Sequence, residues 1–133
     1  MFVTETIRTR ERNGFVDITA RVAAAVSRSG IKEGVAIVFV PHTTAAVTIN
    51  ENADPDVKSD MTRKLGEMIP HRESYYDHAE GNSDSHVKTS LVGPSLTVIV
   101  HDGELVLGTW QGIYFCEFDG PRNREFHVKV MAG

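Results

Sequence analysis

The stretch that decides the fold class is Val35-Ala36-Ile37-Val38-Phe39-Val40, which lies between Gly34 and Pro41. A short, continuous apolar run that is rich in β-branched residues is typical of a strand buried on both faces. The segment Thr44–Ile49 follows after a brief turn, so we expect it to pair with this strand. The run is far too short to cross a bilayer, and no membrane partner is expected.

Further strands are predicted on both sides of this run. They cover Phe2–Thr9, Leu96–His101, Glu104–Leu107, Ile113–Phe118 and Glu125–Met131. The dipeptide Asp102-Gly103 is a strong signal for a hairpin between two of these strands. The segment Glu11–Gly14 reads as a turn.

Three helices are expected among the strands. The first begins at Asp17 or Thr19 and ends at Gly30. The clearest opens at Asp54-Pro55, because Asp is a favoured N-cap and Pro is tolerated at the first helical position. A short third helix is capped by Ser83 or Asp84 and runs to Leu91. Since strands and helices do not alternate regularly, the pattern favours an α+β fold over a doubly wound sheet.

Length and composition set broad limits on the protein. The 133 residues fall in the range of a single domain, residues 1–133, and 41% of them are hydrophobic. The net charge of −4 argues against nucleic acid as the main partner. Cys116 is the only cysteine, which suits a reducing compartment, and the N-terminus has no signal-peptide pattern. We therefore expect a cytoplasmic location.

The polar chemistry is concentrated in two segments, and the first is Pro41–Asp56. His42 follows the buried strand and can reach a site at the end of the sheet. Alternatively, it satisfies backbone groups of a turn. Carboxylates around the next helix start are favoured by the helix dipole, so capping is the expected role of Asp54. Glu51 precedes the cap and is freer to act in a site.

The second segment, His78–Lys88, combines two histidines, carboxylates, an amide, hydroxyls and a lysine. Zn²⁺ accepts imidazole and carboxylate ligands, Mg²⁺ accepts carboxylates and phosphates, and an open helix N-terminus binds phosphate. His86 lies on a different helical face from Val87 and Leu91, and we expect it to point toward the loop. The spacing matches no standard zinc signature, and a solvated capping loop is the alternative.

Two residues in the C-terminal half stand out as well. Trp110 lies close to two glycines and is a candidate wall of a pocket or a subunit interface, with core packing as the alternative. Arg122 is a candidate partner for an anionic ligand or a carboxylate. Cys116 lies in an apolar strand, which predicts an inert buried thiol.

Taken together, these segments resemble the YjbQ-like family of secondary thiamine-phosphate synthases. The resemblance covers nearly the whole chain. It rests on Pro41–Thr44, Glu51–Pro55, Glu80–Asn82, Ser85–Lys88, Gly93–Thr97, Gly108–Tyr114 and Glu117–Arg122. The strings Glu51-Asn52-Ala53-Asp54-Pro55 and Gly108-Thr109-Trp110-Gln111-Gly112-Ile113-Tyr114 are specific in combination.

The resemblance implies a seven-stranded β-sandwich with flanking helices, assembled as a homotrimer. It also implies one site near the subunit boundary, in which His42, His78 and His86 hold a divalent metal, Zn or Mg, and the segment Glu51–Asp54 takes part. The implied activity, here expected to be weak, joins hydroxymethylpyrimidine diphosphate to a thiazole phosphate with loss of diphosphate.

For this activity the resemblance makes His42, Glu51 and His86 the candidate catalytic residues. Phosphate groups would be bound by Asn82, Ser83, Asp84, Lys88 and Arg122, with Mg²⁺ held by Glu51 or Asp84. The alternative is a non-catalytic trimeric module that binds a metal or a small anionic ligand, since no nucleophile or acid–base pair can be assigned from the residues alone.

Overall fold

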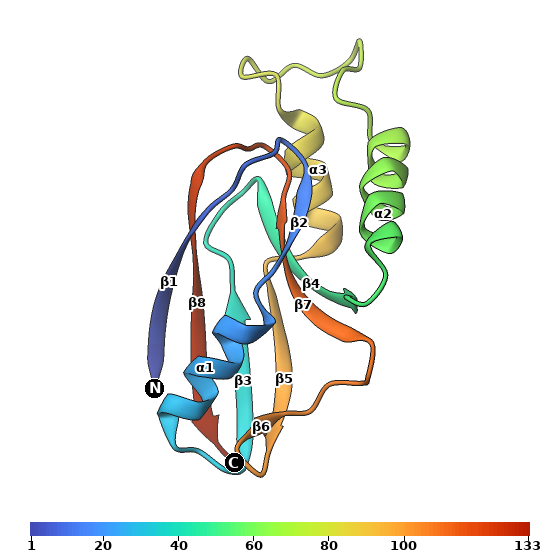
Figure 1. The fold of residues 1–133 in the computed structure, drawn as a ribbon. Coiled ribbons are helices and arrows are strands. Elements are labelled where there is room, and N and C mark those ends of the chain that lie inside the picture. Colours follow the sequence, from blue (N-terminus) through green and yellow to red (C-terminus); the bar gives the residue numbers. More distant parts are fainter.

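The structure, a computed structural model, describes residues 1–133 and contains eight strands and three helices. The strands are β1 Phe2–Arg8, β2 Gly14–Asp17, β3 Gly34–Phe39, β4 Ala45–Glu51, β5 Ser95–His101, β6 Glu104–Leu105, β7 Gln111–Glu117 and β8 Asn123–Ala132. The helices are α1 Thr19–Ser29, α2 Pro55–Met68 and α3 Ser83–Val92. The expected α+β class is confirmed (Figure 1).

The strands form two antiparallel sheets that curl toward one another. One has five strands in the order β1-β8-β3-β5-β6, and the other has three in the order β2-β7-β4. The count is eight rather than the seven that the resemblance implied, because the four-residue strand β2 follows the turn at Glu11–Gly14 directly. Its pairing with β7 places Phe15 opposite Cys116, a partner that lies about a hundred positions away along the chain.

The predicted pairing of Thr44–Ile49 with the apolar strand is wrong. Strand β3 lies between β8 and β5, and β4 pairs with β7 in the other sheet. The chain from Pro41 to Thr44 therefore crosses between the sheets. Strand β3 is also not buried on both faces, since Ala36 and Val38 are fully buried but the Phe39 side of the strand is partly exposed. Strand β7 is the one that is buried on both faces.

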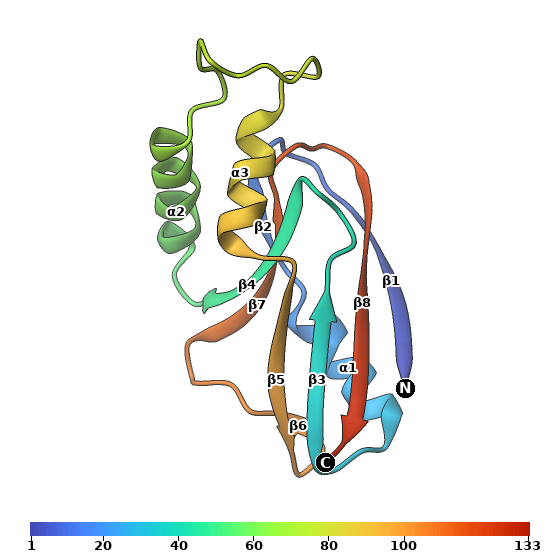
Figure 2. The ribbon, with the colours of Figure 1, turned by 180° about the vertical axis from the view of Figure 1, so that it is seen from behind.

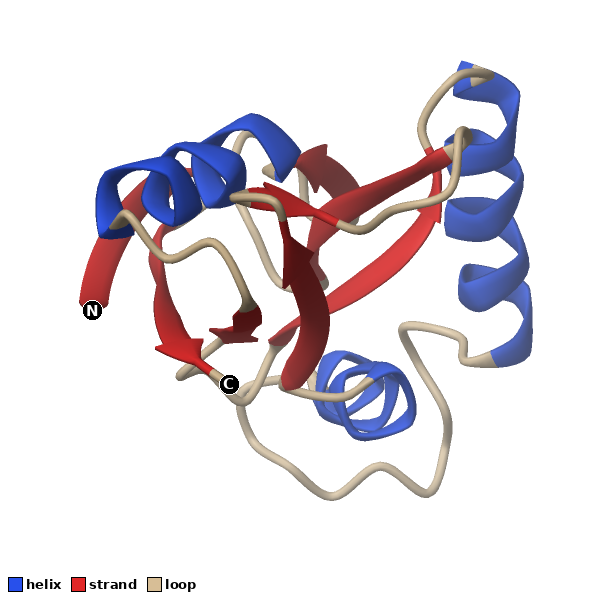
Figure 3. Cartoon of the chain, turned by 90° about the horizontal axis from the view of Figure 1, so that it is seen from below, coloured by secondary structure: helices blue, strands red, loops and turns tan.

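The main core fills the space between the two sheets and α1. It contains inward-facing residues of β3, β5 and β8, the strand residues Val47 and Phe115 of the smaller sheet, and Val22 and Val26 of α1. A smaller cluster around Cys116 and Phe118 lies on the other side of β7, next to residues of α2 and α3. Seen from below, α1 covers a different side of the sheets from α2 and α3 (Figure 3).

Helix α2 begins as the sequence predicted. Asp54 is its N-cap and accepts a hydrogen bond from the backbone N–H of Asp56 at 2.9 Å, and Pro55 is the first helical residue. However, none of its residues is fully buried, and Met68 is 60% exposed. No helix in the chain has both the length and the apolar character needed to span a membrane.

Helix α3 reverses the usual distribution of polar and apolar residues. Its cap position is Asn82 rather than Ser83 or Asp84, and the Asp84 side chain is turned inward. Asp84 and Lys88 are buried, whereas Val87 and Leu91 are 43% and 65% exposed.

The five-stranded sheet also leaves one face uncovered. This is the face opposite α1, which no helix covers in Figure 2.

Candidate functional site

A polar cleft of about 490 Å³ opens where three connections of the fold meet. The β3–β4 crossing contributes Pro41 to Thr44, and the segment leading into α3 contributes His78, Glu80, Asn82 and His86. The connection from β7 to β8 contributes Asp119 and Arg122, and the start of β8 contributes Arg124. No hydrophobic residue lines the cleft, which is within the size range of small-molecule sites.

His42 is held in one tautomer at the edge of this cleft. Its Nε2 accepts a hydrogen bond from the backbone N–H of Glu125 at 3.1 Å, so the proton of the neutral ring is on Nδ1. Partial burial and then the charge of Arg124 lower the pKa of His42. The ring therefore stays neutral and offers an N–H donor. Binding a metal through His42 would require the loss of the bond to Glu125.

Arg124 is fixed in place by a buried network. Its Nε donates to Glu117 Oε1 at 2.9 Å, and its Nη2 donates to Glu117 Oε2 and to Thr44 Oγ1, the latter at 2.9 Å. Thr9 Oγ1 donates to Glu117 as well, at 2.7 Å. Burial raises the pKa of Glu117, but the donors from Arg124, Thr9 and the Asp119 backbone outweigh it and hold the pKa low. Nη1 of Arg124 makes no hydrogen bond within the protein.

A second network orients the opposite wall of the cleft. Asp119 accepts from Asn82 Nδ2 at 2.7 Å and from Arg122 Nη2 at 2.9 Å. Burial raises the pKa of Asp119, but these donors more than offset it and the pKa is lowered. Because Nδ2 of Asn82 is committed to Asp119, the orientation of the amide is settled. Its Oδ1 is buried without any partner, so Asn82 has an acceptor left for a ligand.

His78 and His86 form a close pair in the cleft. Their ring centroids are 5.4 Å apart and the rings are nearly perpendicular. Two imidazoles that share a tetrahedral ion, with Zn–N bonds of about 2.0–2.1 Å, place their centroids roughly 5 Å apart. Glu80 and the unpartnered oxygen of Asn82 belong to the same lining, but no three ionisable side chains of this cleft bring their ligand atoms within 4.8 Å of one another.

The cleft does not include every residue that the sequence singled out. Ser83, Asp84 and Lys88 do not line it. Asp84 instead binds Arg12, with Nη1 to Oδ2 at 3.0 Å, and Lys88 donates to Asn13 at 2.9 Å. The two residues thus anchor α3 to the turn after β1, because their charges face inward rather than toward the cleft.

Only the start of the first polar segment, Pro41 to Thr44, meets the second segment in the cleft. His42 precedes β4 and Glu51 is its last residue, so the length of the strand separates them. The segment after Glu51 packs instead against the turn before β7, where Asn52 N donates to the backbone oxygen of Trp110 at 2.9 Å. A Cβ at Gly112 would lie 2.4 Å from Asn52 Nδ2, which requires glycine there. Trp110 itself is 62% exposed and lines no part of the cleft.

Sequence reasoning missed Arg124, Glu117 and Asp119 as site residues. A usable signal existed for the first two. Arg124 has the same strand parity as the buried residues Phe126 and Val128, and Glu117 ends an otherwise apolar strand. A charged residue at a buried strand position usually needs a partner of opposite charge, so the pair could have been predicted.

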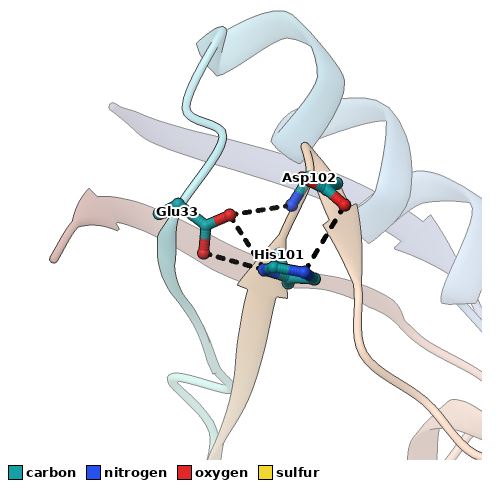
Figure 4. Close-up of side chains that lie close together, drawn as sticks. All are labelled: Glu33, His101 and Asp102. Carbon is teal, nitrogen blue, oxygen red and sulfur yellow. Dashed lines mark hydrogen bonds and ion pairs between the residues drawn. The ribbon is translucent and has the colours of Figure 1, made fainter.

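A separate cluster of ionisable groups lies at the far end of the five-stranded sheet (Figure 4). His101 Nδ1 is 2.8 Å from Glu33 Oε1, and its Nε2 is 3.4 Å from Asp102 Oδ2. This is the one trio of such side chains whose ligand atoms lie within 4.8 Å of one another, and all three residues are exposed. Because each ring nitrogen already faces a carboxylate, the geometry is that of an imidazolium between two acids.

The fold and the cleft thus define a class of α+β protein with two curled sheets and a histidine–arginine cleft between their connections. A family model described as UPF0047 protein YjbQ-like matches residues 4–133. The chain belongs to the YjbQ/UPF0047 family.

Relatives and solved structures agree with this assignment. The UPF0047 protein MJ1081 of Methanocaldococcus jannaschii is 55% identical over 126 residues, covering 95% of this chain and 91% of that protein. The UPF0047 protein YugU of Bacillus subtilis is 53% identical, covering 99% and 100%. A crystal structure of an uncharacterized YjbQ/UPF0047 protein from Clostridium acetobutylicum is 50% identical with a TM-score of 0.95, covering 97% and 99%. A protein of unknown function from Sulfolobus solfataricus is 33% identical with a TM-score of 0.95, covering 100% and 97%.

Proposed function

We propose that the cleft binds a phosphorylated small metabolite and that the protein is a transferase with weak thiamine-phosphate synthase activity. The observation that carries the proposal is the convergence of Arg122, Arg124 and the neutral ring of His42 on one cleft that no hydrophobic residue lines. Guanidinium groups bind phosphate oxygens strongly, and a neutral imidazole adds a donor without a charge.

In the proposed reaction, the thiazole nitrogen attacks the methylene carbon of hydroxymethylpyrimidine diphosphate. The new C–N bond forms as the C–O bond breaks, and diphosphate leaves with the electron pair. Arg124 is already fixed by Glu117 and Thr44, so its free nitrogen can stabilise the leaving group without reorganisation. His42 would donate to a second oxygen of the same group. His86 would orient the diphosphate from the opposite wall.

A divalent ion, Zn or Mg, would be held by His78 and His86 with Glu80, and it would supply positive charge for the diphosphate. Its identity would follow from the ligands that the cleft offers, because Zn²⁺ favours imidazole and Mg²⁺ favours carboxylate and phosphate. Under the alternative function, a non-catalytic module, the same residues would bind a metal or a small anion without turnover.

We also propose that the chain forms a homotrimer. The support is apolar surface that this chain leaves uncovered, on α3 at Val87 and Leu91 and on the outer sheet face at Phe39 and Ile99. Since Glu51 lies at the far end of β4 from His42, it would reach a cleft only from a neighbouring copy.

The test is an assay of the purified protein with both substrates and Mg²⁺, in which thiamine phosphate is measured by chromatography. We expect Arg122→Gln and His86→Ala to lower the rate about 10²-fold or more. The matched control is His101→Ala, because His101 lies at the end of β5 and outside the cleft. Binding of diphosphate without turnover would leave the non-catalytic module as the function. Equal activity in His86→Ala would remove the role of that residue.

A further inference from the structure

The turn between β1 and β2 contacts both walls of the cleft while lining neither of them (Figure 1). One wall, the α3 wall, is the segment leading into α3 and presents Asn82 and His86. The other, the connection wall, is the chain between β7 and β8 and presents Asp119 and Arg122. The side chain of Arg12, which belongs to the turn, reaches toward both walls. Nothing in the function proposed above uses Arg12.

Arg12 fixes the α3 wall through Asp84. Nη1 of Arg12 donates to Asp84 Oδ2 at 3.0 Å, and Nη2 donates to Oδ1 at 3.1 Å, so the two groups meet as a planar fork. Asp84 is fully buried in the first turn of α3, the turn that also carries His86. Because a bidentate pair sets orientation as well as distance, it limits how this end of the helix can rotate or slide.

Arg12 also holds the connection wall, by its backbone and by its charge. Its backbone oxygen accepts a hydrogen bond from Gly120 N at 3.0 Å. Its Nη2 lies 4.0 Å from Asp119 Oδ1, whereas Asp119 Oδ2 accepts the hydrogen bonds of Asn82 and Arg122. One guanidinium therefore lies between a carboxylate of α3 and a carboxylate of the connection, and it ties the two walls to one turn.

The charge of Arg12 also explains how a carboxylate can line a cleft for anions. Asp119 belongs to the lining, and an unbalanced negative charge there would repel a phosphate group. Burial raises the pKa of Asp119, but the hydrogen bonds of Asn82 and Arg122, followed by the charges of Arg122 and Arg12, lower it. Arg12 thus shares the charge of Asp119 with Arg122, and it does so from outside the lining.

We propose that Arg12 is a positioning residue of the cleft, which acts through Asp84 and Asp119 by fixing the two walls relative to each other. Its effect on a ligand rests on the function proposed above, whereas its effect on the walls is present without any ligand. A small displacement of the walls weakens the binding of a ligand that must reach both of them. Diphosphate, which has two phosphoryl groups, is therefore the probe of their spacing.

The experiment compares Arg12→Gln with the unchanged protein in two measurements. The first, without ligand, records the NMR signals of the side-chain amide of Asn82 and of the Nε–H of Arg122, which both donate to Asp119. These signals should shift or broaden in Arg12→Gln. The second is a calorimetric titration with diphosphate, in which Arg12→Gln should weaken binding about tenfold. Arg63→Gln, at an exposed ion pair on α2, is the matched control and should change neither result.

Arg12→Lys tests the fork separately from the charge. It keeps the positive charge and loses the planar fork, so it should fall between Arg12→Gln and the unchanged protein in both measurements. If Arg12→Gln does not fold, Arg12→Lys decides in its place by the same signals. A residue that only stabilises the fold would lower the unfolding temperature of both variants and leave the Asn82 and Arg122 signals of the folded protein as they were.

The outcomes separate the two proposals. If the signals of Asn82 and Arg122 do not depend on Arg12, or if diphosphate binds equally well to Arg12→Gln and to the unchanged protein, the positioning role is wrong and the function proposed for the cleft stands. If the signals move but diphosphate binds to neither protein, the function proposed for the cleft fails while the positioning of the walls by Arg12 stands.

Discussion

Two clusters of ionisable groups in this protein each combine a basic side chain with carboxylate, but they differ in burial and in their position in the fold. Glu33, His101 and Asp102 meet at the tip of a hairpin, where their side chains are 57%, 62% and 83% exposed. Glu117 and Arg124 meet under the connections of the two sheets, where their side chains are 1% and 5% exposed. Judged by the distances between ligand atoms, the exposed trio is the better candidate for a metal site.

The difference shows that proximity alone does not mark a site. In the exposed trio every ring nitrogen of His101 already faces a carboxylate (Figure 4), and none of the three residues lines the cleft of the candidate site. The buried pair keeps one nitrogen of Arg124 unpartnered, and Arg124 lines the cleft of the candidate site. A cluster that is internally satisfied has little to offer a ligand, whereas a rigid cluster with one donor left over is prepared to bind.

The largest effect should come from the buried pair. Arg124→Met would leave the carboxylate of Glu117 buried without its main partner, and we expect the free energy of unfolding to fall by about 3–5 kcal/mol. Urea denaturation at neutral pH measures it. The loss should shrink in the double variant Glu117→Gln/Arg124→Met, because no charge is then stranded. A loss below about 1 kcal/mol in the single variant would show that this pair contributes no more to stability than an exposed ion pair does.

A middle-sized effect is expected at Asp84, which is buried but whose partner Arg12 is partly exposed. Asp84→Asn removes the charge that faces both Arg12 and Lys88, and we expect a loss of roughly 2–3 kcal/mol in the free energy of unfolding. Asp56→Asn, at an exposed position in the first turn of α2, is the matched control and should change little. Equal losses in the two variants would show that burial of α3 does not depend on this charge.

The smallest effect should come from the exposed trio. Hydrogen bonding to Glu33, followed by the charge of Asp102, raises the pKa of His101, and the same hydrogen bond lowers the pKa of Glu33. The contribution of His101 to stability is present below its unfolded pKa of about 6.5 and is lost as the pH rises through the raised value. The contribution of Glu33 is present above its unfolded pKa of about 4.3 and is lost as the pH falls through its lowered folded pKa.

The ion pair between Glu33 and His101 therefore stabilises the fold between the lowered pKa of Glu33 and the raised pKa of His101. NMR titration of the ring protons of His101 measures the pKa of that residue. Glu33→Gln should bring the pKa of His101 down toward its usual range, whereas Asp60→Asn on α2 should not. A pKa of His101 that is the same with and without Glu33 would contradict the geometry in Figure 4.

Much of the fold could be predicted because its signals are local. The cap at Asp54 and the hairpin at Asp102-Gly103 depend on residues a few positions apart, and both are confirmed, the latter with positive φ at both residues. The pairing of strands is decided by long-range contacts. Hence Thr44–Ile49 was assigned to the wrong partner, and the short strand β2 was missed.

The candidate site was predicted in part for the same reason. The sequence pointed to His42, His78 and His86 through their dense polar surroundings, and the structure brings all three to one cleft. Glu51 lies in an equally polar stretch, but a whole strand separates it from them. Arg124 and Glu117 were missed because each is the one charged side chain among the buried positions of its strand, and only the pairing of distant strands brings the two together.

Helix α3 has a consequence for judging natural variation in this protein. Its inward face carries Asp84 and Lys88, and its outward face carries Val87 and Leu91. A scale that scores substitutions by hydrophobicity would rate Asp84→Leu as a better core and Leu91→Gln as a harmless surface change. The first would strand two cations, and the second would remove apolar surface that another copy of the chain is proposed to cover. At Asp84, Val87, Lys88 and Leu91, the scores of such a scale should be read with the opposite sign.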